Sequence, residues 1–418
     1  MLTELLLASL ALPALYEENG RDGALAQLLL HEVGLADTMP LFAPIPQDPS
    51  LATLCKAFLI QPNIQSTPEH WAEQLNKSLR SFTRLFRQQT GMSFLDTVHA
   101  RARANPRRIV LPEGADERTL VAAAKLVKDG LAIPTVLGGP EIGAELQRIG
   151  AEGVALVDPA HDPRRPDLAK RLYERRKAKG LTEDEAYRKS ADPLYFGALL
   201  LAAGEVDACV SGAMNTTGDV LRAALWAVGP AQGIRTVSSS FYMVVPDFRG
   251  AGEEVLTYSD AAVVPDPTAE QLADIAVAAA DARRRVVGDD PRVAFLSYST
   301  KGSAAGPLVD EVRQALEIFR QKMPGVPVDG EMQADAALIE SVGARKSPGS
   351  PVAGRANVLI FPDLNAGNIA YKLTQRLANA EAVGPIVQGL ARPCSDLSRG
   401  ADADDIVNAA CIMALLAV

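Results

Sequence analysis

The chain has 418 residues, 48% of them hydrophobic and 22% charged, which is the composition of a globular protein long enough for two or three domains. Its formal net charge of −9 gives no general bias toward nucleic acid. Four scattered cysteines contain no CxxC pair, so they give no zinc-ligand pattern and fit a reducing compartment. We therefore expect a cytoplasmic protein.

An apolar run at residues 5–15 imitates the core of a signal peptide. Glu4 is acidic where a signal peptide carries basic residues. Eleven residues that include Pro13 are also too few to span a bilayer. We interpret the run as a buried structural segment and expect no membrane partner.

Residues 1–94 read as short helices joined by proline-rich connectors. A turn at 76–78 separates two of these helices, and the second carries Arg80, Arg84 and Arg87. Such a pattern is typical of a helix-turn-helix, although a small helical bundle with a solvated basic face has the same pattern. The predicted helices lie at 22–33, at 50–60, from Thr67 and Pro68 onward, and at 79–89, with a connector at 39–46.

Trp71-Ala72, residues 78–87 (SLRSFTRLFR) and residues 90–94 (TGMSF) resemble the first helix-turn-helix of AraC-type transcription regulators. That family carries a second unit, whereas this sequence changes character at Phe94. Residues 1–94 hold six Lys or Arg against nine Asp or Glu, a balance of −3. DNA binding also depends on phosphate contacts, so we predict no sequence-specific DNA binding.

From residue 107 onward, short apolar strands alternate with helices, a pattern that predicts a layered α/β fold with parallel pairing and right-handed crossovers. The predicted strands are 108–112, 133–137, 154–157, 207–210, 236–245, 261–264, 293–298, 356–361 and 385–390. The clearest predicted helices are 116–128, 167–179, 217–228, 269–287 and 306–321, and Thr182 with Glu185 forms a capping box for a further one.

Four loops at strand ends are rich in Gly and in hydrogen-bonding side chains: 113–116, 211–217, 297–303 and 362–368. Ligands of α/β sheets bind at such ends, and Gly allows close approach of the backbone to an anion. None of the loops is a Walker A or GxGxxG motif. Taken singly, each loop reads as an ordinary turn and not as a ligand site, but the four together favour a phosphate-handling cleft.

The stretch 383–405 combines a strand, a break at Pro393, a polar loop from Asp396 to Arg399, and the start of a final apolar helix at Asp402 and Asp405. A helix N-terminus attracts oxyanions, and Arg adds a planar charged fork. An acid in a first helical turn is also an ordinary cap, and a loop Arg is often only a surface charge. Spacing alone leaves both interpretations open.

The identity of the residues favours the oxyanion site over an ordinary helix cap with a surface arginine. Gly384-Pro385-Ile386, residues 388–391 (QGLA), Pro393 and residues 396–400 (DLSRG) resemble the C-terminal signature of phosphate acetyltransferases, and the resemblance covers residues 95–418. It implies a two-lobed three-layer α/β/α fold with a cleft, of the isocitrate/isopropylmalate dehydrogenase type, after a small helical N-terminal segment. The implied domains are 1–94, a first lobe of 95–234 completed by 389–418, and a second lobe of 235–388.

The resemblance also implies roles for residues. Asp405 matches the base that takes the proton of the coenzyme A thiol, and Ser398 matches the hydroxyl that hydrogen-bonds the thiolate. Arg399 matches the arginine that binds the acetyl carbonyl and its oxyanion. Arg176 and Arg222 match residues that contact coenzyme A and phosphate, although Arg176 could equally lie on a solvated helix face. Further expected substrate contacts are Asn368, Ser299, Thr300 and Lys301.

The implied activity is reversible acetyl transfer, acetyl-CoA + phosphate = acetyl phosphate + CoA, in a ternary complex without a covalent acyl-enzyme. Coenzyme A is a substrate, no cofactor or metal is needed, and a homodimer is expected. A longer acyl chain, as in phosphate butyryltransferases, stays open because one methylene is worth only about 1–3 kcal/mol. The sequence also fits two non-catalytic roles. One is the regulatory tail of certain malic enzymes. Such a tail is attached to a malic-enzyme domain, and residues 1–94 are too short to form one. The second is a regulator that senses acetyl-CoA or acetyl phosphate. Ser395 and Ala401 stand where the family usually has Asn and Cys.

Overall fold

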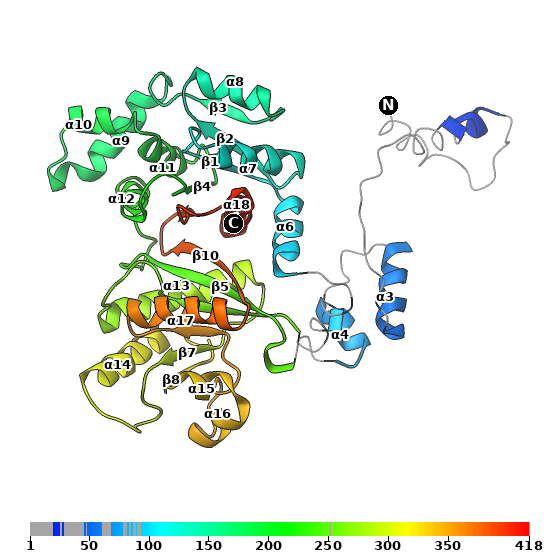
Figure 1. The fold of residues 1–418 in the computed structure, drawn as a ribbon, viewed down its shortest axis with the longest axis vertical. Helices are drawn as coiled ribbons and strands as arrows, with labels where there is room; N and C mark the ends of the chain where they lie inside the picture. The colour runs from blue at the N-terminus through cyan, green and yellow to red at the C-terminus, as the bar shows by residue number, and fades with distance from the viewer. Residues whose placement is uncertain are drawn as a thin grey trace. The chain divides into compact units, whose positions relative to one another are not determined.

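The computed structural model describes residues 20–25, 27–28, 46, 48–60, 68–77, 82, 85–86, 89, 93–250 and 252–417 (Figure 1). The chain divides into two compact units, Met1–Phe82 and Thr83–Val418. The second unit holds both β-sheets, and its helices and strands make a mixed α/β fold.

The first unit contains α3 (Pro49–Ile60) and α4 (Pro68–Gln74). The carboxylate of Asp48 accepts the N–H groups of Ser50 and Leu51 at 3.1 and 3.0 Å and so starts α3. Pro68 is the first residue of α4, as predicted. Trp71 of α4 packs edge-on against two phenylalanines, Phe58 and Phe82.

Several N-terminal predictions lie outside the described residues. They are the apolar run 5–15, most of the connector 39–46, the cap Thr67, half of the predicted helix 22–33 and most of the predicted helix 79–89. Residues 21–25, 27–28, 82, 85–86 and 89 are described and are helical.

A five-stranded parallel sheet, in the order β11-β4-β1-β2-β3, forms one half of the second unit. Its strands are β1 (Arg107–Leu111), β2 (Ala132–Leu137), β3 (Ala155–Val157), β4 (Ala208–Ser211) and β11 (Cys394–Asp396). Successive side chains of β1 point to opposite faces: Ile109 joins a core with α7, and Val110 joins a core with α9, α11 and α12. These helices are α7 (Glu117–Lys128), α9 (Arg165–Arg176), α11 (Pro193–Ala203) and α12 (Thr217–Ala227), and α8 (Pro140–Arg148) and α10 (Glu183–Lys189) complete this half.

A six-stranded sheet, in the order β10-β5-β6-β9-β7-β8, forms the other half. Its strands are β5 (Ser238–Val245), β6 (Glu254–Ser259), β7 (Val293–Leu296), β8 (Val328–Met332), β9 (Val358–Ile360) and β10 (Glu381–Gln388). The prediction of parallel pairing throughout is wrong here, because β5 is antiparallel to both β6 and β10. In the described residues of the link between β5 and β6, 246–250 and 252–253, there is a single turn of 3-10 helix (Phe248–Gly250) and no crossover helix of the kind that parallel neighbours need. The accompanying helices are α13 (Ala269–Val286), α14 (Pro307–Lys322), α15 (Ala334–Leu338), α16 (Glu340–Lys346) and α17 (Leu364–Leu377).

The strand predicted at 261–264 does not form, and β6 lies just before it. The carboxylate of Asp260 accepts the N–H groups of Ala262, Val263 and Val264 at 3.0, 3.3 and 2.7 Å. A side chain that binds the following backbone competes with strand pairing, so this apolar segment forms a bend.

The polar loop predicted after Pro393 begins instead as strand β11, at the edge of the first sheet. Cys394 lies opposite Cys209, and Asp396 lies opposite Ser211. The strand is only three residues long and depends on a partner far away in sequence, so apolar periodicity could not reveal it. The chain thereby crosses directly from β10 of one sheet to β11 of the other.

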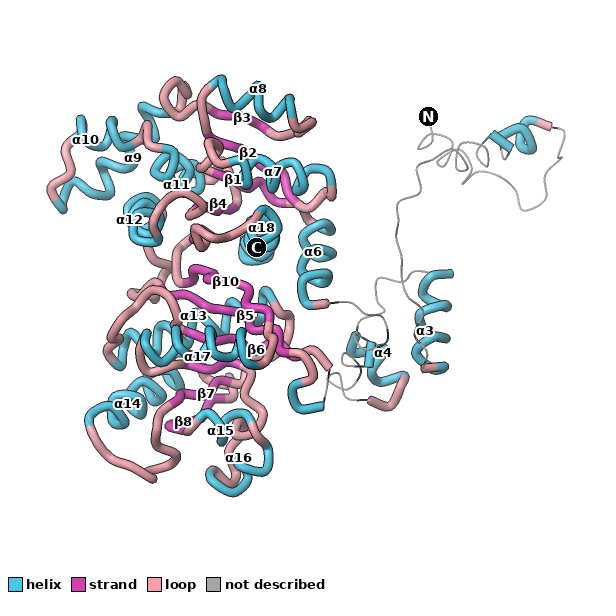
Figure 2. The backbone as a smooth tube through the Cα atoms, in the orientation of Figure 1, coloured by secondary structure: helices cyan, strands magenta, loops and turns pink. Residues whose placement is uncertain are grey.

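The final helix α18 (Ala403–Leu416) begins after Asp402, as predicted. It lies between the two sheets, beside α6 (Phe94–Ala104) (Figures 1 and 2). Its Ile412 belongs to a single buried cluster with Ile109 of the first sheet and Tyr242 of the second. The last helix thus packs on the first half, as the family resemblance implied, and also joins it to the second.

Candidate functional site

The turn between β11 and α18 carries Ser398 and Arg399, both exposed. The hydroxyl of Ser398 accepts the N–H of Gly400 at 3.3 Å, and its carbonyl accepts the N–H of Ala401 at 2.8 Å. These bonds close a tight turn and leave the hydroxyl proton uncommitted. Within residues 93–250 and 252–417, the Arg399 guanidinium has no hydrogen bond or ion pair, so it is available to an anionic or carbonyl ligand.

Asp405 lies in the first turn of α18 and is exposed. One of its carboxylate oxygens accepts the N–H of Asp402 at 3.0 Å, and the Asp402 carboxylate accepts the N–H of Asp405 at 2.9 Å. This capping box confirms that Asp405 is a cap. Its other oxygen makes no bond in the described part of the chain, so capping and proton acceptance are compatible.

Asp396 fixes the other end of the turn. Its side chain is buried, and the hydroxyl of Thr217 at the start of α12 donates to one carboxylate oxygen at 2.6 Å. The second oxygen is buried without a hydrogen-bond partner among the described residues. Burial raises the pKa of Asp396 to about 6, against a smaller lowering by the Thr217 hydrogen bond.

Replacing Asp396 by Asn is expected to change how stability depends on pH. Because the folded-state pKa is raised, the wild-type carboxyl stabilises the fold fully below pH 4, and this contribution is lost as pH rises through about 6. Between pH 4 and 7 the wild type should therefore lose about 2 kcal/mol more unfolding free energy than Asp396→Asn, at about 1.4 kcal/mol per pKa unit. Urea unfolding at both pH values measures this difference. Asp162→Asn should change in the opposite sense, because Arg164 lowers the pKa of Asp162.

The loop 211–217, expected to hold phosphate, binds a carboxylate of the chain itself. Buried Glu113 accepts four consecutive backbone N–H groups, at 2.7, 2.7, 3.0 and 3.0 Å, from Gly212, Ala213, Met214 and Asn215. The anion-binding nest predicted from the glycine and polar content therefore exists, but Glu113 occupies it. Sequence analysis missed this role because the partners lie about a hundred residues apart.

The side chains of Ser299, Thr300 and Lys301 mainly hold their own loop against β8. Ser299 donates to Glu331 at 2.8 Å, the hydroxyl of Thr300 accepts the Gln333 N–H at 2.9 Å, and Lys301 pairs with Asp329. Both hydroxyl residues are buried. Burial alone would raise the pKa of Glu331, but hydrogen bonds from Arg313, the Gly302 N–H and Ser299 lower it to about 2. Substrate contact by these three residues stays a prediction.

Arg176 and Arg222 are both near enough to Tyr195 for their charges to act on it. The Arg176 guanidinium lies over the ring of Trp226, 4.5 Å from its centroid. Arg222 pairs with Asp219 at 2.7 Å, in an exposed contact that contributes little stability. Burial raises the pKa of Tyr195, and the charges of both arginines act against that shift. Both therefore lie near α11 and α12, and the start of α12 is joined to β11 through the Thr217–Asp396 bond.

Asn368 belongs to the first half of α17 in the second sheet's half of the unit. Its amide donates to the Ala261 carbonyl at 3.1 Å and accepts from Lys372 at 2.9 Å.

The predicted site residues thus fall in two groups. Five are in the half of the first sheet, namely Arg176, Arg222, Ser398, Arg399 and Asp405, and four are in the half of the second, namely Ser299, Thr300, Lys301 and Asn368.

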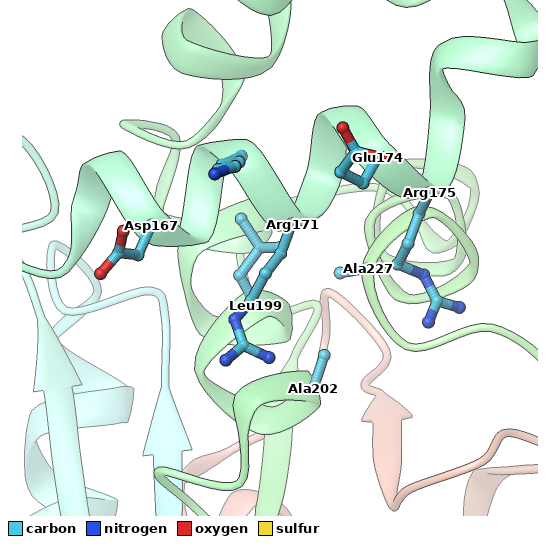
Figure 3. Close-up of a pocket in the computed structure, with 8 residues that line it drawn as sticks. Asp167, Arg171, Glu174, Arg175, Leu199, Ala202 and Ala227 are labelled. Atoms are coloured by element: carbon cyan, nitrogen blue, oxygen red, sulfur yellow. The ribbon is translucent and has the colours of Figure 1, made fainter.

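A surface hollow of about 540 Å³ lies between α9, α11 and α12, and Figure 3 shows Arg171 extending from α9 toward Leu199 and Ala202. None of the predicted site residues lines this hollow. Arg175, which does line it, donates to the Val228 carbonyl at 2.8 Å.

In the described part of the chain, no group of three or more His, Cys, Asp or Glu is arranged to hold a metal. No described helix is both long enough and apolar enough to span a membrane.

Comparison with known proteins gives one consistent result. The family model described as phosphate acetyl/butaryl transferase matches residues 93–414. The phosphate acetyltransferase of Acetivibrio thermocellus is 46% identical over 327 residues, which cover 78% of this chain and 98% of that protein. That of Thermoanaerobacterium thermosaccharolyticum is 47% identical over 318 residues, covering 76% and 97%.

A solved structure agrees with the sequence comparisons. The phosphotransacetylase of Streptococcus pyogenes has 39% sequence identity and a TM-score of 0.74, with 78% of this chain and 99% of that chain covered. The likeness therefore extends along almost the whole of these proteins and includes the β11–α18 turn. The chain belongs to the phosphate acetyl/butaryl transferase family.

Proposed function

We propose that the chain catalyses reversible acetyl transfer between coenzyme A and inorganic phosphate and serves acetate metabolism. The exposed turn that leads into α18 carries this proposal, since it presents a hydroxyl, a guanidinium with no partner among the described residues, and a carboxylate within eight residues, Ser398 to Asp405. The relatives named phosphate acetyltransferase support the acetyl group as the acyl chain. A butyryl or longer acyl chain is the competing possibility, which the assay below decides.

The proposed chemistry needs one base and two stabilising groups. Asp405 accepts the thiol proton, and because a thiol has a pKa near 8.5 the emerging thiolate needs the hydrogen bond of Ser398. The thiolate attacks the carbonyl carbon of acetyl phosphate, and Arg399 stabilises the oxyanion. Collapse of the tetrahedral intermediate leaves the new C–S bond, breaks the C–O bond to phosphate and releases phosphate. In the reverse direction Asp405 returns the proton to the thiolate.

We propose that Arg176 and Arg222 bind the anionic part of coenzyme A. Trp226 keeps Arg176 in place by cation–π contact. Asn368 and the loop 299–301 would contribute from the other half. The ammonium group of Lys301 donates one hydrogen bond to Asp329 and one to the Gly330 carbonyl. Because an ammonium group has three N–H donors, one is left for a ligand.

Substrates would then bind in a cleft between two lobes, 95–234 with 389–418 and 235–388, arranged as in isocitrate and isopropylmalate dehydrogenases. The two sheets fall in these two ranges, which supports the division. We further propose a homodimer, as the family resemblance implies, and a cytoplasmic location, which the scattered cysteines without a CxxC pair support.

A thiol-release assay tests the function. The full chain is expected to release coenzyme A from acetyl-CoA only when phosphate is present, and to turn over butyryl-CoA more slowly. Faster turnover of butyryl-CoA would assign the longer acyl chain. Binding of acetyl-CoA without turnover of either thioester would favour the sensing regulator.

Residues 1–94, which resemble a truncated AraC-type regulator, are proposed to be dispensable for catalysis. A chain that begins at Ser93 retains the cap of α6, where the Ser93 hydroxyl accepts the Asp96 N–H at 3.1 Å. We expect it to fold, dimerise and keep kcat within about twofold, as for changes outside a site. Activity and light-scattering mass of both lengths measure this.

The full chain is expected to bind an operator-like duplex no more tightly than random duplex DNA at physiological salt, because residues 1–94 carry a balance of −3. Electrophoretic mobility with both duplexes measures the ratio. Loss of acyl transfer on truncation would show that the N-terminal helices are part of the enzyme, and a clear preference for one duplex would restore the DNA-binding interpretation.

A further inference from the structure

Arg118, the second residue of α7, uses every donor of its guanidinium inside the protein. Two N–H groups go to the Asp116 carboxylate at 3.0 and 2.7 Å. A third donates to the Ala213 carbonyl at 2.8 Å. The remaining pair, on Nη1, reaches the carbonyls of Arg399 and Ala401 at 2.9 and 2.6 Å. A guanidinium has five N–H donors, so none is left for a ligand.

We propose that Arg118 is a positioning residue for acyl transfer, which holds the backbone of the turn from Ser398 to Ala401 in its working conformation. This inference rests on the proposed function. The two bound carbonyls lie on either side of Gly400, the residue with the greatest conformational freedom in the turn. Fixing them restricts the backbone from which the Arg399 side chain extends.

The other contacts of Arg118 hold its guanidinium in place against two further segments of the protein. Ala213, whose carbonyl Arg118 binds, belongs to the loop whose N–H groups are held by buried Glu113. Arg118 also holds the pKa of Asp116 below its usual range, chiefly through its side-chain hydrogen bond, and Asp116 caps α7. The loops after β1 and β4 are therefore tied to each other, and the catalytic turn is tied to both.

Arg118 is unsuited to the second role open to an arginine at such a site, binding a substrate anion. Its side chain is 35% exposed, but its donors are all taken by oxygens of the protein. An anion would have to displace a carbonyl of the catalytic turn to reach it. A direct ligand and a positioning residue predict different kinetics, because loss of the first raises KM and loss of the second lowers kcat.

The chain contains a matched control. Arg164 forms the same two-residue arrangement with Asp162, at 2.9 and 2.8 Å through Nε and Nη2, and an additional ion pair with Glu205 at 3.6 Å. Its guanidinium reaches no backbone carbonyl in residues 93–250 or 252–417. Arg164→Lys and Arg164→Ala therefore remove an equivalent Asp–Arg pair without touching the turn.

In the full chain, Arg118→Lys is expected to lower kcat by about a hundredfold, the scale of a misplaced catalytic group, with KM for coenzyme A changed less than about threefold. Lysine has three donors on one atom and cannot span the carbonyls. Guanidinium ion added to Arg118→Ala should recover part of kcat. Neither Arg164 variant should lose kcat or respond to guanidinium.

Hydrogen exchange supplies a readout that does not depend on activity. The Ala401 amide, hydrogen-bonded to the Ser398 carbonyl, should exchange about tenfold faster in Arg118→Lys than in the wild type, and unchanged in Arg164→Lys. Unchanged exchange at Ala401, or a rise confined to KM, overturns the positioning role. An inactive wild type would instead reject the proposed function, while the exchange rates would still decide whether Arg118 orders the turn.

Discussion

Replacing Asp405 by Asn is expected to reduce kcat by at least about a hundredfold, the usual scale for loss of a general base. The amide cannot accept the thiol proton, whereas its oxygen can still accept the Asp402 N–H that now completes the capping box. Helix α18 should therefore remain folded. Steady-state kinetics in both directions, with thermal unfolding as a check, measure the change.

Asp404 provides the control for this prediction. It is the neighbouring carboxylate, exposed, and paired with Lys125 at 2.6 Å. Asp404→Asn removes the same charge from the same helical turn, so it reproduces any effect on the helix dipole. We expect its kcat to stay close to that of the wild type. Near-normal kcat in Asp405→Asn, or an equal loss in both variants, would reject Asp405 as the base.

The parts of the site that sequence could predict are contiguous. Ser398, Arg399 and Asp405 lie in one turn–helix segment, so the local signals of a turn and of a helix start place them together, although strand β11 before them was not predicted. Capping chemistry is similarly local: the box predicted at Thr182 forms, and α18 starts after Asp402 as predicted, with a box where the sequence indicates only an ordinary cap. Local rules were sufficient for these caps, but they failed at 261–264, where Asp260 binds the N–H groups of the next residues and a bend replaces the predicted strand.

Other missed features depend on partners that are distant in sequence. Buried strand β8 contains Asp329 and Glu331, which read as polar loop until Lys301 and Arg313 are seen to neutralise them. Glu113 lies in the predicted loop 113–116, but its role could not be predicted, because the first backbone N–H that it binds, that of Gly212, lies 99 residues later. Tertiary pairing overrides local propensity at such positions.

The two departures from the family pattern also act on the backbone of the turn. Ser395 is buried in β11, and its hydroxyl accepts the Val387 N–H at 3.3 Å, so it links β11 to β10. Ala401 is buried as well, and its carbonyl is one that Arg118 binds. Both side chains are thus buried, whereas Arg399 is exposed to solvent. Both substitutions therefore lie beside the turn, and neither changes Ser398, Arg399 or Asp405.

Arg399→Lys is expected to lower kcat by about a hundredfold, with a smaller effect on the affinity for coenzyme A. Lysine keeps the positive charge but loses the planar fork that can meet a developing oxyanion with fixed donors. One well-placed donor of this kind contributes about 3–4 kcal/mol to the transition state. The carbonyl of residue 399 remains bound to Arg118 in the variant, so the turn itself should be unchanged.

Arg392→Lys is the matched control, an exposed arginine on the other side of β11 that has been given no role in the site. kcat and KM for coenzyme A and for acetyl phosphate, measured for both variants, separate two roles of Arg399. A kcat loss confined to Arg399→Lys supports oxyanion stabilisation, because that contact strengthens only in the transition state. If Arg399→Lys instead raises KM for coenzyme A at constant kcat, Arg399 binds the ground state, and the oxyanion must be stabilised by different donors such as the N-terminus of α18.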